Sequence, residues 1–302
     1  MFVTYDAPAP PDKKQDEGLG QGKHGVYLTP LWLFCSGAAG SDTEVNAIAG
    51  AWGKFTGTKV KTHESLDPNR PDPSVNMNYY KNWLVDNETA YQLLASKDNA
   101  GEKDAKCQSW VDLFRHVLLD GGVAQSKFSR VGIQTQFAGL GIMLINDWTF
   151  AQQGTSNVAG FPYLNKLTQA SELSTLGPSN FIRTNPANGR WEFFWGPNPD
   201  ATDADGAKGQ NVSNPRSFFS SHFIMRIGDT LYDPSYGRQF SAPAGPDGSA
   251  ILAACVAWEQ GSLAAFGKAI TDKGADGKDY VDKFVFAKNT PDRDLQFIPV
   301  PW

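Results

Sequence analysis

The chain has 302 residues, 40% of them hydrophobic and 20% charged, so its composition predicts a folded protein with a sizeable core. The net charge is −5 and no dense run of Lys or Arg occurs, which argues against a nucleic-acid or anionic-membrane surface. No apolar stretch reaches the roughly 18 residues of a membrane span, and no signal peptide is visible at the start. The sequence does not indicate a localisation.

The N-terminal region is predicted to be separate from the rest. A short strand over residues 2–6 is cut off by three prolines, and a polar tract follows. We therefore expect 1–25 to be a strand and linker, either an isolated edge strand or the tail of an upstream domain in a longer chain. The remainder, 26–302, is expected to form the main domain.

Three helices are predicted in the first half from the spacing of apolar residues. Two of them cover 44–55 and 88–96, and Asn87 is the expected cap of the second. The third begins at an N-cap residue, Asp104, and carries Cys107 at its third position before a Gly-Gly pair ends it. The segment before Cys107 is polar, so this helix start is expected to be accessible.

The second half is predicted to consist mainly of strands. They are expected at 128–136, 141–150, 191–195, 223–227, 230–232 and 281–287, the last being the final strand. A long helix is expected over 250–269. The loop 196–216 is long by the usual standard and rich in Gly, Asn, Asp and Pro.

Metal sites have little support in this sequence. The three cysteines cannot all pair within one chain, so at least one thiol is free. The zinc spacings Cys-x-x-Cys and His-Glu-x-x-His are absent, and the four histidines are scattered. The acidic loop 200–206 does not fit a calcium loop, whose twelfth position would be Val212. We therefore expect no metal and no cofactor.

Cys107 is a candidate nucleophile because of its position. In the first turn of a helix, the macrodipole and the free N–H groups stabilise a thiolate. Lys106 adds local positive charge. The alternative is an ordinary structural cysteine, since free cysteines are among the most buried residues.

His222 and Asp233 are predicted to meet across a hairpin. If Gly228-Asp229 is a two-residue turn, Ile224 faces Asp233, which then lies diagonally across from His222 on the same face. A thiol, an imidazole and a carboxylate are the parts of an activated-thiolate acyl-transfer site. The alternatives are a structural histidine and a plain turn at Asp-Pro-Ser-Tyr-Gly.

Three motifs in this order resemble the transglutaminase-like superfamily of papain-like thiol enzymes, over about residues 80–240. The runs Thr-Ala-Tyr-Gln-Leu-Leu from position 89 and Cys-Gln-Ser-Trp-Val-Asp-Leu-Phe from position 107 are similar to its nucleophile helix. The His-Phe strand at 222 and Tyr-Asp-Pro-Ser-Tyr at 232 are similar to its His strand and Asp-Pro motif.

The resemblance implies an α+β papain-like fold, with the nucleophile helix packed on an antiparallel sheet. It also implies a Cys107–His222–Asp233 triad that forms an acyl-enzyme on a protein or peptide amide, as a protease, glutamine deamidase (including a deamidating toxin) or transglutaminase. For the oxyanion, the backbone N–H of Cys107 is the first donor, and Trp83 and Gln92 are weaker candidates. The alternative is a non-catalytic scaffold or binding module of a larger secreted or surface protein.

The sequence departs from the family in the distance between nucleophile and histidine. Position 222 follows position 107 by 115 residues, where compact members have a few tens. The excess corresponds to an insertion at about 151–216. We expect its last part, 196–216, to form a mobile rim over the Cys107 cleft, with Phe218 and Phe219 as the buried anchor; a loop on the far face is the alternative.

Overall fold

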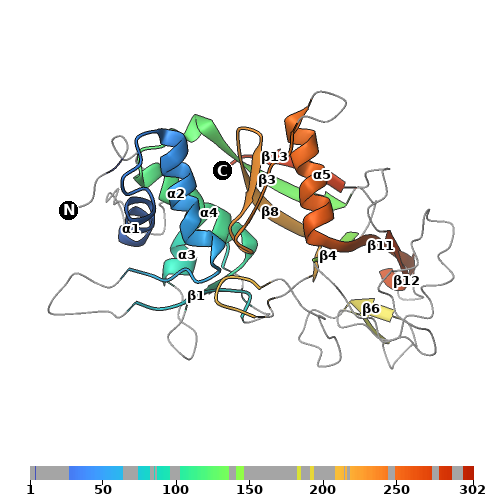
Figure 1. Ribbon diagram of the computed structural model, residues 1–302. Coiled ribbons are helices and arrows are strands. Elements are labelled where there is room, and N and C mark those ends of the chain that lie inside the picture. Colours follow the sequence, from blue (N-terminus) through green and yellow to red (C-terminus); the bar gives the residue numbers. More distant parts are fainter. Residues whose placement is uncertain are drawn as a thin grey trace.

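The computed structural model describes residues 4, 27–63, 74–81, 85, 87–95, 103–135, 141–145, 182–184, 191–193, 208–213, 215, 218–243, 249–273, 279–287 and 295–302. In these parts the chain combines α-helices with antiparallel sheets, so the α+β class is confirmed (Figure 1). The predicted strand at 2–6 apart from residue 4, most of the insertion at 151–216, and Trp83 lie outside the described residues.

The helices are α1 (Leu28–Gly37), α2 (Glu44–Thr56), α3 (Ala90–Ala95), α4 (Cys107–Asp120) and α5 (Ala250–Ser262), with a short 3-10 turn at Gln125–Lys127. Helix α4 is central, because all its residues except Gln108 are buried. It packs against α1, α2, α3 and the strand β8 described below. None of the helices in the described parts is long and apolar enough to cross a membrane.

A five-stranded antiparallel sheet carries the hairpin predicted around Gly228. Its order is β10-β9-β8-β3-β13, with β3 at Phe128–Thr135, β8 at Ser221–Ile227, β9 at Thr230–Asp233, β10 at Arg238–Phe240 and β13 at Leu295–Val300. Gly228 has a φ of +57°, which a two-residue hairpin turn requires, and Ile227 pairs with Thr230. The predicted register of this hairpin is confirmed.

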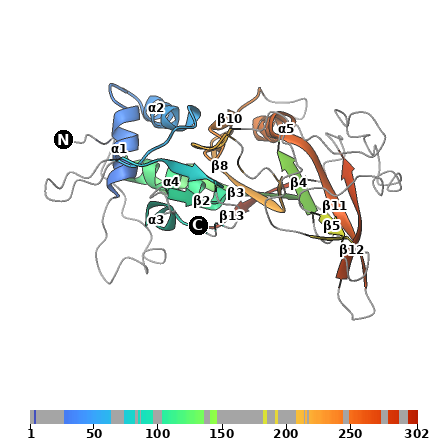
Figure 2. The ribbon, with the colours of Figure 1, turned by 90° about the horizontal axis from the view of Figure 1, so that it is seen from below.

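A second antiparallel sheet lies at the end of the molecule away from α1–α4 (Figure 2). Its order is β5-β6-β12-β11-β4-β7, with β4 at Gly141–Ile145, β5 at Ile182–Thr184, β6 at Trp191–Phe193, β7 at Phe218–Phe219, β11 at Leu263–Lys273 and β12 at Asp279–Ala287. A parallel pair, β1 (Met77–Tyr79) and β2 (Lys103–Ala105), lies next to α3 and α4.

Both helix caps predicted near Cys107 are wrong. Asp104 belongs to β2, where pairing with β1 keeps the backbone extended, so α4 begins only at Cys107. Its carboxylate accepts a hydrogen bond from the N–H of Lys81 (3.1 Å) instead of capping α4. Asn87 donates to the Asp104 carbonyl (2.7 Å), and the hydroxyl of Thr89 accepts from the first turn of α3.

The secondary structure predicted for the C-terminal part of the chain is also wrong in two places. The helix predicted over 250–269 ends at Ser262, and the chain continues as β11, because pairing with β4 and β12 outweighs the local helical pattern. The strand predicted at 281–287 is present in β12 but is not the last. β13 follows and pairs with β3, and its Pro299 is tolerated because β13 is an edge strand.

Candidate active site

Cys107 occupies the first helical position of α4. Lys106, at the N-cap, is extended (φ −77°, ψ 171°) and offers no side-chain cap, so the N–H groups of the first turn are not satisfied by a capping side chain. The thiol therefore lies in the positive field of the helix start. None of Cys35, Cys107 and Cys255 forms a disulfide bond.

The expectation that Cys107 lies at an accessible helix start is only partly met. Cys107 is only 5% exposed, because the segment before it is the buried strand β2 and not a loop. Cys107 nevertheless lines a pocket of about 200 Å³. The other lining residues are Tyr80, Glu88, Lys106, Gln108, Phe219, Ser220, Ser221 and Phe223.

His222 and Asp233 form a buried pair, as the hairpin register predicts. Nε2 of His222 lies 2.7 Å from Oδ2 of Asp233, and the two residues are 0% and 1% exposed. Nδ1 of His222 makes no regular hydrogen bond with any described residue. Since Asp233 holds Nε2, Nδ1 is the ring nitrogen that remains for the thiol.

The imidazole of His222 is held in its charged form. Burial lowers its pKa, but the charge and hydrogen bond of Asp233, with a smaller contribution from the nearby Cys107 thiol, outweigh burial and raise the pKa to about 10. Helix α4 packs against β8, which brings the Cys107 thiol near the imidazole, although Nδ1 of His222 makes no hydrogen bond to it. Loose contacts of this kind are common in unliganded catalytic sites.

Aromatic rings enclose the histidine. The ring centroids of Phe219, Tyr236 and Trp258 lie 5.4, 5.7 and 6.1 Å from that of His222. Tyr79 belongs to the same cluster, and burial together with nearby charges raises its pKa well above the usual value. Few water molecules can screen charges in such surroundings, so the attraction between His222 and Asp233 is strong.

Tyr80 is a pocket residue that the sequence reasoning missed. It has a φ of +49°, in the left-handed region that bulky residues rarely adopt. Such strain is often found at functional sites, where the surrounding structure maintains it. The backbone N–H of Tyr80 bonds to the Ala105 carbonyl (3.2 Å), which ties it to the strand before the nucleophile.

Neither oxyanion candidate chosen from the sequence is placed at the thiol. Trp83 lies outside the described residues. Gln92 is exposed and is not among the residues that line the Cys107 pocket. Its amide oxygen accepts hydrogen bonds from the backbone N–H groups of Glu88 (2.8 Å) and Thr89 (3.0 Å), so its role is local to the start of α3.

Gln210 is a second residue that the sequence reasoning missed. It lies in the only part of the predicted rim that the structure describes. Its side-chain nitrogen donates to the carbonyls of Phe55 and Pro234, both at 2.8 Å, and its backbone N–H donates to Ser235 (3.0 Å). It is 0% exposed, so the predicted rim is anchored in the core at this residue, while Lys208 and Ser213 on either side are exposed. Gln210 fixes the turn that follows Asp233.

Phe219 is buried as expected, at 3% exposure, and lines the Cys107 pocket. The residues before 208 in the predicted rim lie outside the described part, so the rim itself remains a prediction. In the described parts, no group of three or more His, Cys, Asp or Glu residues is arranged to hold a metal ion.

Comparisons with protein-family models, with curated proteins and with solved structures return no match.

Proposed function

We propose that this protein is a papain-like, transglutaminase-like enzyme that transfers an acyl group from an amide through a Cys107 thioester. The observation that carries the proposal is the meeting of Cys107 with a histidine and a carboxylate from a hairpin far along the chain. A thiol at a helix start lies beside a buried imidazole whose other nitrogen is held at 2.7 Å by a carboxylate. This combination supports a nucleophile, an acid–base group and an orienting group.

In the proposed reaction the Cys107 sulfur attacks the carbonyl carbon of an amide bound in the pocket. The tetrahedral intermediate collapses with cleavage of the C–N bond, and His222 gives its proton to the departing amine. Water or an amine then attacks the thioester carbon and gives a proton to His222. The C–S bond breaks, which releases the acid or the new amide and restores the Cys107 thiolate. Asp233 keeps the ring oriented and stabilises its positive charge throughout.

The oxyanion of the intermediate requires donors next to the sulfur. The backbone N–H of Cys107, at the first position of α4, is the first donor. Because Tyr80 lines the same pocket, we assign its hydroxyl as the second donor, in place of Trp83 and Gln92.

The second candidate function is a non-catalytic binding module with the same fold. The observation that favours it is the 5% exposure of Cys107, together with the ion pair between Lys106 and Glu88 (3.1 Å) at the pocket. A binding module has no need to activate the thiol.

Reaction with iodoacetamide, followed residue by residue with mass spectrometry, separates the two candidates. An enzyme should be modified at Cys107 faster than at Cys35 or Cys255, and His222→Ala should slow this step at neutral pH. Equal rates in the wild type and in His222→Ala would favour the binding module.

Activity itself can be measured as peptide cleavage, ammonia release from a glutamine peptide, and incorporation of a fluorescent amine. Cys107→Ala should abolish whichever product is formed, and Cys35→Ala is the matched control that should leave it unchanged.

A further inference from the structure

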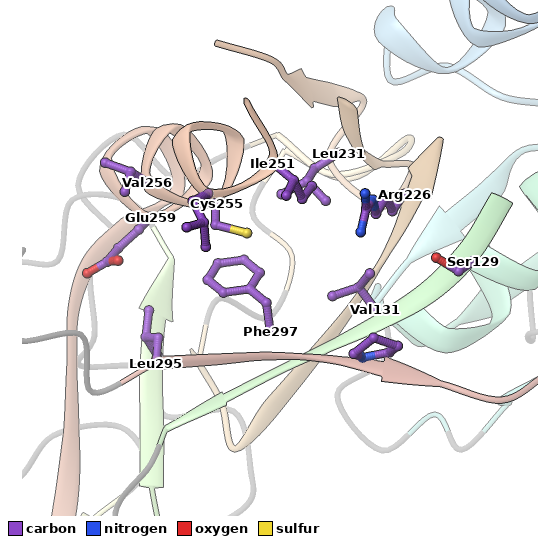
Figure 3. A pocket seen from close by; sticks show the side chains of 12 residues that line it. Ser129, Val131, Arg226, Leu231, Ile251, Cys255, Val256, Glu259, Leu295 and Phe297 are labelled. Carbon is purple, nitrogen blue, oxygen red and sulfur yellow. The ribbon is translucent and has the colours of Figure 1, made fainter. Parts of the chain in front are cut away.

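A second cavity, of about 300 Å³, lies between α5 and the five-stranded sheet (Figure 3). Its walls are mostly apolar and come from both layers; they include Val131, Leu231, Ile251, Val256, Leu295 and Phe297. The cavity opens to solvent at its edge, where Leu252 in its wall is 39% exposed. A cavity of this size is in the range of small-ligand sites, which are apolar with a few well-placed polar groups.

The charged groups of this cavity differ between its two ends. Arg226 and Ser129 are directly opposed on neighbouring strands and lie at one end, while Glu259 lies on α5 toward the other (Figure 3). The Nε of Arg226 donates to the Gly228 carbonyl (2.7 Å), and one terminal nitrogen lies 3.7 Å from the exposed carboxylate of Asp229. A guanidinium has five N–H donors, so Arg226 retains capacity for a ligand.

We propose that this cavity binds a small unbranched carboxylic acid. The alkyl chain would lie among the apolar walls, and the carboxylate would accept hydrogen bonds from Arg226 and the hydroxyl of Ser129. The acidic side chain of Glu259 disfavours the opposite orientation, because two carboxylates would then approach each other. Paired N–H···O bonds to a carboxylate are the arrangement for which arginine is best suited.

The cavity is connected to the triad through two aromatic rings. Phe297, in the cavity wall, packs edge-on against Trp258, with centroids 5.7 Å apart at 86°. Trp258 is fully buried and stacks on His222 at 6.1 Å and 24°. Strand β8 also carries both Arg226 and His222, so the cavity and the imidazole share a strand as well as this aromatic contact. We therefore assign a regulatory role to the bound acid. A regulatory role for a ligand here rests on the proposed acyl transfer at Cys107.

Cys255 provides a readout that does not depend on catalysis. Figure 3 shows its sulfur directed toward the cavity above Phe297. Saturating decanoate should slow the alkylation of Cys255 several-fold in the wild-type chain. Across hexanoate, octanoate and decanoate, affinity should rise about fourfold for each added methylene group, since burial of one such group contributes about 0.8 kcal/mol.

Arg226→Gln should weaken decanoate binding about tenfold and leave decanol binding unchanged, while Lys59→Gln, an exposed lysine elsewhere, should change neither. Val256→Phe should fill the cavity and abolish binding, and Val45→Phe on the surface is the matched control. The absence of saturable protection of Cys255 at any chain length would overturn the site. Equal decanoate affinity in wild type and Arg226→Gln would overturn the assignment of a carboxylate.

The regulatory role is measured in the same samples. The alkylation rate of Cys107 should change with the same decanoate midpoint as the protection of Cys255. If Cys255 is protected while the rate at Cys107 stays constant, the coupling through Trp258 is refuted. An inert Cys107 with normal protection of Cys255 would instead contradict the proposed acyl transfer, so the two proposals fail separately.

Discussion

Asp233→Asn replaces the carboxylate that faces His222 with an amide of the same size. The amide can keep a hydrogen bond to the ring but carries no charge. In the wild type, burial opposes the imidazolium, and the Asp233 charge is the largest of the effects that overcome this opposition. We therefore expect His222 to be neutral in the variant at pH 7 and to lose its ability to stabilise the Cys107 thiolate.

The size of the effect follows from the pKa of His222. A rise from the ordinary 6.5 to about 10 corresponds to on the order of 4–5 kcal/mol, at about 1.4 kcal/mol for each tenfold change in proton affinity. Because the folded-state pKa is the higher one, this stabilisation is fully present below about pH 6.5 and is lost as the pH rises through about 10. Removing one partner of a buried ion pair costs about 3–5 kcal/mol, which agrees with the value obtained from the pKa of His222.

The assay combines urea unfolding and iodoacetamide kinetics between pH 6 and pH 10. Asp233→Asn should be destabilised by about 3–5 kcal/mol at pH 6, and the difference from the wild type should shrink toward pH 10. Its alkylation at Cys107 should fall at least about tenfold at pH 6, and any amide turnover by about 10³–10⁴-fold.

Asp229→Asn, in the exposed turn of the same hairpin, is the matched control and should change none of these quantities by more than about 0.5 kcal/mol. An Asp233→Asn protein with wild-type stability and alkylation at pH 6 would refute the charged-pair argument.

Three further substitutions test other parts of the site. Gln210→Ala should lower the free energy of unfolding by about 3–5 kcal/mol, because several buried backbone groups lose their partner, whereas the exposed Gln239→Ala should have little effect in urea unfolding. Tyr80→Phe should reduce amide turnover by about 10²–10³-fold without slowing the alkylation of Cys107 by iodoacetamide. An equal loss of the turnover rate and the alkylation rate would contradict an oxyanion role. Gly237→Ala should cost at least about 2 kcal/mol, because φ is +61° and the new Cβ would lie 2.4 Å from a carbonyl oxygen. Its control, Gly53→Ala in α2, meets nothing within 4 Å and should stabilise slightly.

Local patterns in the sequence were sufficient to predict the elements that carry Cys107, His222 and Asp233. The apolar period of 107–120, closed by a glycine pair, predicted α4 to within a few residues. The Gly-Asp pair at 228–229 predicted both the hairpin turn and its register. These features depend on neighbours a few residues apart, and so does the meeting of His222 and Asp233.

Other features depended on residues far away in the chain. The start of α4 at Cys107 is set by pairing of Asp104 with β1, and the end of α5 by pairing of β11 with two other strands. No local pattern contains these partners, so sequence reasoning placed both boundaries wrongly.

The site as a whole was decided by tertiary packing. The sequence identified a thiol, an imidazole and a carboxylate as candidates, but only the packing of α4 against β8 brings Cys107 to the histidine. Gln210 illustrates the same limit, since a glutamine in a polar loop has no sequence feature that predicts complete burial. Its buried place is possible only because carbonyl and N–H groups from distant segments satisfy its amide, and such partners exist only once the chain has folded.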